Sequence, residues 1–307
     1  MTGWLVVNRF LHSQKFTEIH KWLLDAAIAR NIQLELKSNA SIMVSLSENI
    51  NFIKQIPVEQ QPEFVLFWDK DIRLAQALEK MGLRLFNSSK GIENCDDKSL
   101  THLLLSQHHI PMPKTIIAPM TYSNIGYTDF SFIDRIEEKL GYPMIIKECF
   151  GSFGQQVYLL HNRMETEEKA KQLQGTPFLF QEFIKYSAGR DVRIQVVGNQ
   201  VITSMYRYAV NGDFRANITN GGSMKYYEPT EKEKKLALQC CKILGLDFAG
   251  VDLLFVENGN VLVCEVNSNA HFKNIYDCTG VNTADYIMDH IIYTLKSNED
   301  KTKVSET

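Results

Sequence analysis

The sequence lacks the features that mark membrane, secreted and nucleic-acid-binding proteins. No apolar run approaches the roughly 20 residues of a membrane-spanning helix, and the apolar start at residues 4–7 is too short for a signal-peptide core. Lys and Arg number 33 against 36 Asp and Glu, and neither sign forms a long block, so nothing favours nucleic-acid or membrane binding. We expect a soluble, cytoplasmic protein whose 307 residues allow two or three domains.

Motifs of common catalytic and redox sites are also missing. The six cysteines form no Cys-x-x-Cys pair and lie mostly in apolar stretches, which indicates reduced, buried thiols. The glycine-containing loop at residues 151–154 is not a Walker A sequence, which argues against a P-loop fold. His102, His108 and His109 are scattered on expected helices, and we assign the histidines no role. The sequence shows no internal repeat.

Strands and helices alternate through the first third of the chain. The apolar pattern predicts strands at residues 4–7, 42–46, 64–68 and 83–86, helices at residues 17–29 and 71–81, and a helical turn at residues 48–54. Alternation of this kind predicts a parallel sheet.

The rest of the chain predicts a mixed arrangement of strands and helices. Helices are expected from residue 96 or 97 to 107 and at residues 130–140, 165–173 and 231–244, with strands at residues 115–118, 144–147, 156–160, 178–181, 191–197 and 201–206. A capping box, Thr230 with Glu233, marks the start of the last helix, and Gly245 marks its end. The charged tail after Ser297 is expected to be disordered.

The most informative stretch is residues 250–267, in which two apolar, β-branched runs flank Asn258-Gly259. That pair is typical of a two-residue hairpin turn with positive φ at both positions. Counting back from such a turn along the antiparallel ladder places Asp252 opposite Glu265. Asn267 projects from the same face as Glu265, because side chains alternate along a strand.

Two carboxylates and one amide therefore meet at the open end of this hairpin. Facing carboxylates repel unless a cation lies between them. An all-oxygen set suits Mg²⁺ or Mn²⁺, with phosphate and water completing the coordination. The pattern favours a metal site made by Asp252, Glu265 and Asn267, and a solvated strand end is the alternative.

A phosphate site is predicted at Lys147, which ends an apolar strand four residues before the loop Gly151-Ser152-Phe-Gly154. A lysine inside a buried sheet is costly unless an anion neutralises it, and small residues beside it allow backbone amides to approach phosphate. The alternative is a lysine whose ammonium reaches solvent at the strand end.

A weaker signal comes from Gln181-Glu182-Phe183, which follows an expected strand. Backbone groups there could bond a flat heterocycle, and the aromatic ring could cover its face. On its own, a linker between two lobes is the simpler interpretation.

Three arginines precede the hairpin along the chain. Arg193, Arg207 and Arg215, with Asn217 two residues after the last of them, would present donors to a phosphoryl group or a carboxylate. Ordinary surface salt bridges are the alternative for any one of these arginines.

Together these residues resemble the ATP-grasp carboxylate–amine ligases and, within them, the RimK-like glutamate ligases. The matching pattern consists of Cys-Asp-Asp-Lys98, Ile-Pro-Met-Pro-Lys-Thr115, Lys147 with the glycine loop, Gln181-Glu182, Gly-Arg-Asp191-Val-Arg193, Gly-Asp-Phe-Arg215-Ala-Asn217, Asp252 and Glu265-Val-Asn267. It covers most of the chain. One departure is Gln156, where the family loop usually carries another glycine, so loop closure over the phosphates is in question.

The resemblance implies a role for each position. Lys98 and Lys147 would contact ATP phosphates, Glu182 and Phe183 would line the adenine site, and Asp191 would lie near the ribose. Arg215 and Asn217 would touch phosphate and the reacting carboxylate, and Asp252, Glu265 and Asn267 would hold two Mg²⁺ ions, with Mn²⁺ as a possible substitute. We also expect Gly151, Ser152, Gly154 and Gln181 among the ATP-binding residues and Arg193 and Arg207 among the catalytic residues.

The resemblance also implies an architecture: an α/β N-terminal domain at residues 1–95 and an α+β ATP-grasp fold whose lobes, residues 96–184 and 185–297, enclose ATP. Residues 298–307 would be the disordered tail. Homo-oligomers are common in the family.

The activity implied is the ATP-dependent addition of glutamate or a similar amino acid to a peptide, a protein C-terminus or a small acid, by way of an acyl phosphate. The alternatives are another ATP-grasp peptide ligase and a non-catalytic nucleotide-binding sensor.

Overall fold

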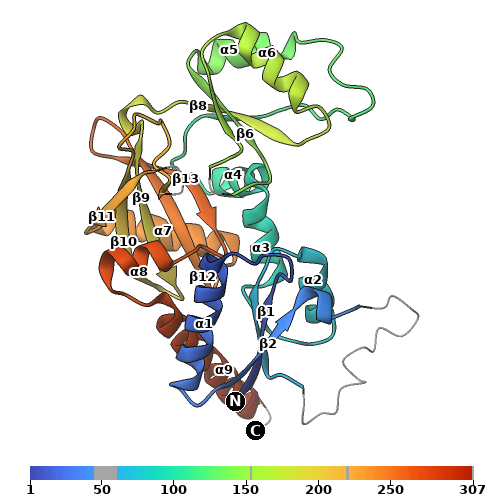
Figure 1. The fold of residues 1–307 in the computed structure, drawn as a ribbon, viewed down its shortest axis with the longest axis vertical. Helices are drawn as coiled ribbons and strands as arrows, with labels where there is room; N and C mark the ends of the chain where they lie inside the picture. Colours follow the sequence, from blue (N-terminus) through green and yellow to red (C-terminus); the bar gives the residue numbers. More distant parts are fainter. Residues whose placement is uncertain (45–60, 153, 219–220, 306–307) are drawn as a thin grey trace.

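Three β-sheets organise the chain, and each is built from a different stretch of the sequence (Figure 1). The structure is a computed structural model that describes residues 1–44, 61–152, 154–218 and 221–305. The strands of the three sheets fall within residues 1–95, 96–184 and 185–297, the ranges predicted as domains. The domain boundaries themselves stay a prediction.

The first sheet is parallel throughout, in the order β2-β1-β3-β4, as the alternating pattern predicted. Its strands are β1 (Thr2–Val7), β2 (Gln33–Ser38), β3 (Phe64–Trp68) and β4 (Leu85–Phe86). Helices α1 (Gln14–Ile28) and α9 (Thr283–Ser305) cover one face, and α2 (Ile72–Lys80) covers the other. Because both faces are covered, β1 and β3 are apolar along almost their whole length.

The sequence pattern fails in one part of this domain. Strand β2 was not predicted, because this partly exposed edge strand has only two apolar residues and lacks the continuous apolar run of β1 and β3. Residues 42–44 of the strand predicted at 42–46 follow a short 3-10 helix, η1 (Asn39–Ser41), and form no strand. The remainder of that strand and the helical turn predicted at 48–54 lie outside the described residues.

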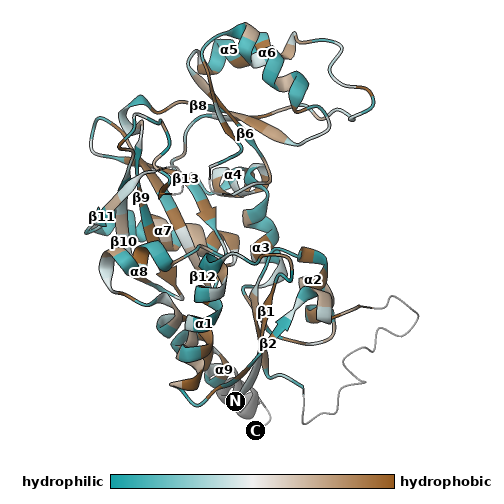
Figure 2. Ribbon diagram, viewed as in Figure 1, coloured by the Kyte–Doolittle hydropathy of each residue, from teal (hydrophilic) through white to brown (hydrophobic). Residues whose placement is uncertain are grey.

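The second sheet is antiparallel, in the order β5-β8-β6-β7. Its strands are β5 (Thr115–Ile117), β6 (Met144–Glu148), β7 (Val157–Leu160) and β8 (Phe178–Glu182), with helices α5 (Phe132–Leu140) and α6 (Arg163–Gln172) on one face. Figure 2 shows these two helices largely in hydrophilic colours, whereas β6 and β8 are mostly hydrophobic. Ile146 and Phe180 face the helices, so Ile145, Lys147 and Gln181 project from the opposite face.

Two helices lead from the first sheet to the second, α3 (Ser89–Asp96) and α4 (Lys98–Gln107). Helix α4 starts directly after one of the two expected positions, and Asp97 caps it: its carboxylate accepts hydrogen bonds from the backbone amides of Ser99 and Leu100 at 2.8 and 3.3 Å. The cap places Lys98 in the first turn of α4.

The third sheet has the order β11-β10-β9-β12-β13. Its strands are β9 (Arg190–Val197), β10 (Gln200–Tyr208), β11 (Ser223–Tyr226), β12 (Phe248–Phe255) and β13 (Val261–Asn267). Helix α7 (Glu231–Leu244) covers one face, begins with the predicted capping box of Thr230 and Glu233, and ends at Gly245 in the left-handed conformation. Helices α8 (Lys273–Thr279) and α9 lie on the other face.

The turn between β12 and β13 differs from its prediction. Only Gly259 of the pair Asn258-Gly259 has a positive φ, at +74°. The Val256 amide donates to the Asn260 carbonyl at 3.1 Å, so three residues, not two, form the loop. The prediction of a two-residue turn with two positive φ angles is therefore wrong.

The register at the open end of this hairpin is nevertheless as predicted, with Asp252 facing Glu265. The longer loop would by itself shift the pairing by one residue. A β-bulge between Asp252 and Leu253 inserts Cys264 as an extra residue on β13 and restores the pairing.

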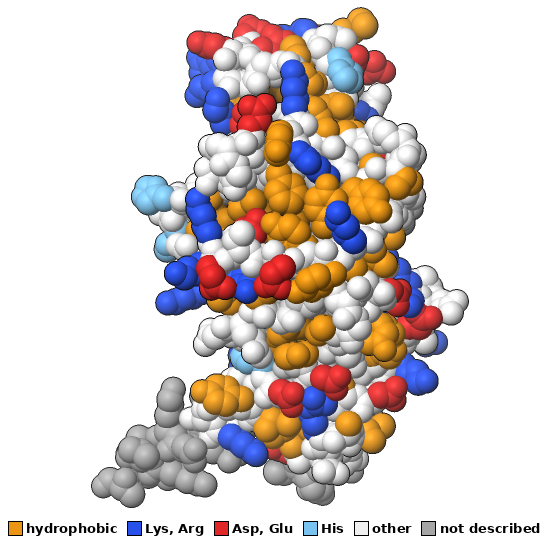
Figure 3. Space-filling view, turned by 90° about the vertical axis from the view of Figure 1, so that its left-hand side faces the viewer, with side chains coloured by type: hydrophobic (Ala, Val, Ile, Leu, Met, Phe, Trp, Pro, Cys, Tyr) orange, Lys and Arg blue, Asp and Glu red, His pale blue; other side chains and the backbone are white. Residues whose placement is uncertain are grey.

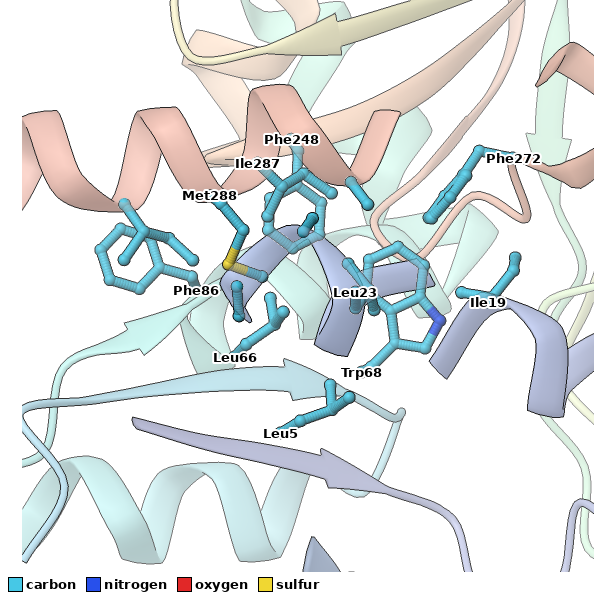
Figure 4. Close-up of a cluster of buried hydrophobic side chains, with 14 of the residues drawn as sticks. Leu5, Ile19, Leu23, Leu66, Trp68, Phe86, Phe248, Phe272, Ile287 and Met288 are labelled. Carbon is cyan, nitrogen blue, oxygen red and sulfur yellow. The ribbon is translucent and has the colours of Figure 1, made fainter. Parts of the chain in front are cut away.

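The tail also needs correction. Helix α9 runs from Thr283 to Ser305, so the prediction of a disordered tail from residue 298 is wrong up to Ser305. The first half of α9 is anchored in the core by Ile287 and Met288 (Figure 4). Ile291 belongs to the same buried cluster. Extending an anchored helix costs little, because only nucleation is expensive, so charged residues can continue it.

One hydrophobic cluster joins the first sheet to the third. In Figure 4, Leu66 and Trp68 of the first sheet lie beside Phe248 of β12 and Phe272, which precedes α8. The Trp68 and Phe248 rings stack with their centroids 5.6 Å apart. The two sheets therefore share a core, which fixes the first domain against the third sheet.

Asn87 provides the polar counterpart of this junction and is fully buried. Its Nδ2 donates to the carbonyls of Phe248 and Ser268, both at 2.9 Å. Its Oδ1 accepts from the amides of Asp247 and Phe248 at 2.6 and 3.1 Å. One side chain thus satisfies four backbone groups of the third sheet and its following loop.

On the face of the molecule seen in Figure 3, basic and acidic side chains are interspersed, and neither forms a patch of its own. All six cysteines are free, and four of them are buried. Within the described part of the chain, no helix combines the length and the apolar character needed to cross a membrane.

We predict that Asn87→Ala destabilises the protein by about 2–4 kcal/mol, because buried backbone groups lose their partners. Urea unfolding measures the effect. Asn199→Ala, in the exposed turn between β9 and β10, is the control and should change the free energy of unfolding by less than about 0.5 kcal/mol. Equal stability of the two variants would contradict the role given to Asn87.

Candidate active site

A cavity of about 550 Å³ is lined by all three parts of the chain. Asn8 and Lys15 come from the first domain, Lys147 from β6 and Asp252 from β12. All predicted site residues line this cavity: Lys98, Lys147, Gly151, Ser152, Gly154, Gln181, Glu182, Phe183, Asp191, Arg193, Arg207, Arg215, Asn217, Asp252, Glu265 and Asn267. Side chains predicted from separate motifs thus belong to one site.

Two lysines face this cavity from the side of the second sheet. Lys147 is only 7% exposed, and its Nζ lies 3.4 Å from the Sγ of Cys264. A thiol is a weak acceptor, and Lys147 takes part in no ion pair with a described residue. The Lys98 Nζ donates to the Gly151 carbonyl at 3.1 Å. The cavity therefore holds a buried ammonium that needs an anion.

The glycine loop makes close contacts that side chains would prevent. A Cβ at Gly154, where φ is +70°, would lie 2.5 Å from the Asn217 Oδ1. A Cβ at Gly151 would lie 2.5 Å from the Gln156 Oε1, and this oxygen also accepts a hydrogen bond from the Ser152 amide at 3.3 Å. Gln156 therefore folds into the loop and engages an amide that could otherwise bind a ligand.

Four charged side chains form a buried network in the wall of the third sheet. Arg193 Nε and Nη2 donate to the two oxygens of Asp252, both at 2.7 Å. Arg207 Nε and Nη2 donate to the two oxygens of Asp191 at 2.6 and 2.7 Å, and Nη2 also reaches Asp252 at 2.8 Å. The pairing of β9 with both β10 and β12 places these residues side by side. Surface salt bridges are thus not the explanation for Arg193 and Arg207.

The network controls the charge of its acids. Burial acts to raise the pKa of Asp252, but Arg193 and Arg207 outweigh it and hold that pKa at about 2. Burial raises the pKa of Asp191, opposed by Arg207. Asp252 therefore stays ionised at neutral pH, and its charged carboxylate is part of the cavity wall.

Of the three predicted metal ligands, Asp252 is engaged through both oxygens by Arg193 and Arg207, so a metal ion would have to use its remaining lone pairs. The other two ligands are less engaged. Glu265 forms no hydrogen bond or ion pair with any described residue, and the Nδ2 of Asn267 is buried without a partner. No group of three or more His, Cys, Asp or Glu side chains in the described ranges could hold a metal ion. Asp252, Glu265 and Asn267 still fit a hard cation whose other ligands come from phosphate and water.

The predicted heterocycle site lies beside β6, the strand that carries Lys147, because Gln181 on β8 pairs with Ile145. Gln181 is 2% exposed, and its Nε2 donates to the Thr115 Oγ1 at 2.9 Å and lies 3.3 Å from the His102 Nε2. Burial, reinforced by nearby lysines, lowers the pKa of His102 to about 3, so its ring is neutral at pH 7. Gln181 thus supports the wall, while Glu182 and Phe183 line the space beside it.

Arg215 and Asn217 link the glycine loop to the third sheet. Arg215 Nη1 donates to the Gly154 carbonyl at 2.9 Å, and its Nη2 pairs with Asp213 at 2.8 Å. The guanidinium therefore touches the loop and borders the cavity at the same time.

The RimK-like ATP-grasp domain is the family model that matches this chain, over residues 95–291. The chain belongs to the RimK-like ATP-grasp family. Beta-citrylglutamate synthase B of Danio rerio is 31% identical over 307 residues, which cover 96% of this chain and 74% of that protein. Human N-acetylaspartylglutamate synthase A is 36% identical over 232 residues, 75% of this chain and 58% of that protein. A probable alpha-L-glutamate ligase of Vibrio atlanticus is 34% identical, over 75% of this chain and 74% of its own length.

Solved structures share the fold. The ATP-grasp ligase PsnB in complex with a minimal precursor has a TM-score of 0.70 at 19% identity and covers 95% of this chain and 99% of its own. D-alanine–D-alanine ligase of Bacillus anthracis in complex with ATP has a TM-score of 0.71 at 17% identity, with 98% and 99% covered. The predicted ATP-grasp fold is confirmed. The family and its relatives support an ATP-dependent, amide-forming carboxylate–amine ligase.

One end of the ATP-grasp cavity was not predicted from the sequence. Asn8, Lys15 and His20 of the first domain line it, together with Asn269 and His271 after β13. A signal was available, because ligands of parallel sheets bind beyond the carboxyl ends of the strands, and Asn8 directly follows β1.

We predict that Gln156→Ala lowers the Kd for ATP, because the Ser152 amide becomes free to donate to a phosphate. One neutral hydrogen bond allows a change of up to about tenfold. Isothermal titration calorimetry with a non-hydrolysable ATP analogue measures it. Gln155→Ala, at the exposed neighbouring position, is the control. Weaker binding by Gln156→Ala than by the control would show that Gln156 supports the loop instead.

Proposed function

We propose that the cavity binds ATP with Mg²⁺ and joins the carboxylate of an acceptor to the amino group of glutamate or a similar amino acid. One observation carries the proposal: the same cavity holds a buried ammonium, Lys147, and a carboxylate, Glu265, neither of which has an ion-pair partner among the described residues. A magnesium-bound phosphate supplies an anion for the first and a cation for the second.

The nucleotide would lie between the second and third sheets. Lys98, Lys147 and the amides of Gly151, Ser152 and Gly154 would contact its phosphates, and Gln181, Glu182 and Phe183 would line the adenine site. Asp191 would lie near the ribose. Because Arg207 takes both of its oxygens, a ribose hydroxyl would use a remaining lone pair.

Asp252, Glu265 and Asn267 would hold Mg²⁺, as one or two ions, with Mn²⁺ as a substitute. Bound there, the metal would neutralise charge on the phosphates. Arg193 and Arg207 would position Asp252 and keep it ionised, since their guanidinium groups are already paired with carboxylates. This is a positioning role in place of the direct catalytic role first predicted.

The reaction would proceed in two displacements. The acceptor carboxylate attacks the γ-phosphorus of ATP, which forms an acyl phosphate and releases ADP. The amine then attacks the acyl carbon, loses a proton and releases inorganic phosphate. Arg215 and Asn217, beside the glycine loop, would stabilise charge on the transferring group.

The names of the relatives guide the choice of substrates. N-acetylaspartylglutamate synthase and beta-citrylglutamate synthase are named for joining glutamate to a small acid, whereas PsnB was solved with a precursor peptide. Their sequence similarity to this chain favours a small acid as the acceptor. A peptide acceptor is the second candidate, and a nucleotide sensor without catalysis is a third that Glu265 argues against.

Phosphate release tests the proposal. We expect ATP consumption that depends on both an amino acid and a carboxylate acceptor, with an amide product seen by mass spectrometry. L-glutamate combined with N-acetyl-L-aspartate, citrate and short acidic peptides forms the first screen. ATP binding without consumption under all of these combinations would favour the sensor.

We predict that Glu265→Gln lowers kcat by at least about 100-fold and leaves most ATP binding intact, because the amide oxygen lacks the negative charge that the carboxylate brings to the metal. Steady-state kinetics and calorimetry separate the two effects. Glu257→Gln, in the exposed turn of the same hairpin, is the matched control and should retain full activity. Unchanged turnover in Glu265→Gln would refute the metal assignment.

A further inference from the structure

One end of the cavity has no role in the nucleotide site proposed above. It is bounded by the first turns of α1 and by the loop after β13, and Lys15, His20, Asn269 and His271 line it. The residues proposed for the phosphates, Lys98 and Lys147, belong to α4 and β6 on the other side of the cavity.

Contacts from the loop after β13 fix this end. The Lys15 carbonyl lies 3.0 Å from the Nε2 of His271 and can only accept, so this nitrogen carries the proton. The Phe16 ring meets the His271 ring edge-on, with centroids 5.9 Å apart. Asn269 Nδ2 donates to the Asp69 carbonyl at 2.8 Å. The first turn of α1 is therefore held in place beside the loop, and Lys15 with it.

Two cations, Lys15 and Arg193, line the cavity near this end, and Asp69 lines it as well. A Cβ at Gly250 would lie 2.6 Å from the Ala270 Cβ and 3.4 Å from the Arg193 Cδ, so Arg193 lies close to the loop after β13. Burial, with a smaller contribution from the charge of Arg193, lowers the pKa of Lys15.

Burial, with the charges of Lys15 and Arg193 adding to it, lowers the pKa of His271 to about 4, so its ring is neutral at pH 7. Asp252 engages Nε and Nη2 of Arg193, and Nη1 has no hydrogen bond to a described residue. An anion between Lys15 and this nitrogen would relieve the repulsion.

We propose that Lys15 and Arg193 Nη1 bind a non-reacting carboxylate of the substrate, so that Lys15 selects substrates with a second carboxylate. The inference rests on the proposed ligase function. The carboxylate belongs either to the amino acid or to the acceptor, and the γ-phosphate of ATP is a competing anion. All three groups offer negatively charged oxygen atoms to the same cations. The experiment therefore has to distinguish the amino acid, the acceptor and the γ-phosphate as the group bound.

The experiment compares each acid with its amide in binding to the full chain with Mg²⁺ and a non-hydrolysable ATP analogue. The probes are L-glutamate against L-glutamine, and N-acetyl-L-aspartate against N-acetyl-L-asparagine. We expect one acid to bind at least about tenfold more tightly than its amide, the effect of a charge-assisted hydrogen bond. In Lys15→Met this preference should fall to about one, while the Kd of the nucleotide stays unchanged.

Two further variants serve as controls. Lys21→Met changes the same residue type on an exposed position of the same helix and should keep the full preference. Lys15→Arg should restore part of it, because the charge returns. A Lys15→Met protein that keeps the preference, or a wild-type protein that has none, overturns the inference. A tenfold loss of nucleotide affinity in Lys15→Met would assign Lys15 to the γ-phosphate and overturn it as well.

The binding measurement needs no turnover, so it separates this inference from the ligase proposal. A preference that depends on Lys15, found together with no amide product, would refute the ligase proposal alone. An amide product made equally well by Lys15→Met, at subsaturating substrate, would refute the inference alone.

Discussion

The buried network of Arg193, Asp252, Arg207 and Asp191 is the interaction on which the site depends. Two positive and two negative charges balance within the wall of one sheet, and their hydrogen bonds lie between 2.6 and 2.8 Å. Breaking a buried pair by removing one member typically costs about 3–5 kcal/mol, because a charge is left without compensation. The wall is therefore rigid, and Asp252 is ionised before any ligand arrives.

The charges outside the network are arranged differently. Lys147 and Glu265 face the cavity without ion-pair partners among the described residues, so the free protein carries part of their desolvation cost. A ligand that brings both a phosphate and a cation removes that cost from both sides. Charges that face the ligand are thus separated from charges that hold the wall. The charged groups that face the ligand are preorganised, and groups of this type stabilise the charge that develops during a reaction.

The sequence predicted many of the residues that line the site, but it predicted few of the contacts between them. Asp252 and Glu265 were paired correctly although the turn was wrong, because the bulge at Cys264 offsets the extra loop residue. The pairing of Arg193 with Asp252 could not be predicted from the sequence, because it depends on the register between β9 and β12, which are far apart in the chain. The alternation of side chains along one strand follows from the local sequence, whereas the identity of the neighbouring strand does not. Lys15 was missed for the same reason, because only the packing of α1 against the loop after β13 brings it to the cavity.

The first domain is consequently part of the site and not only a support for it. Asn87 and the core around Trp68 and Phe248 lock its sheet against the third sheet, which fixes the end of the cavity that α1 closes. In the proposed arrangement, the second and third sheets would contact the nucleotide, and Lys15 of α1 would contact the remaining substrate. A substitution in the first turn of α1 can then change what is ligated without touching the residues that handle ATP. In the proposed arrangement, one phosphate-activating wall would serve different substrates, and Lys15 of the first domain would select those that carry a second carboxylate.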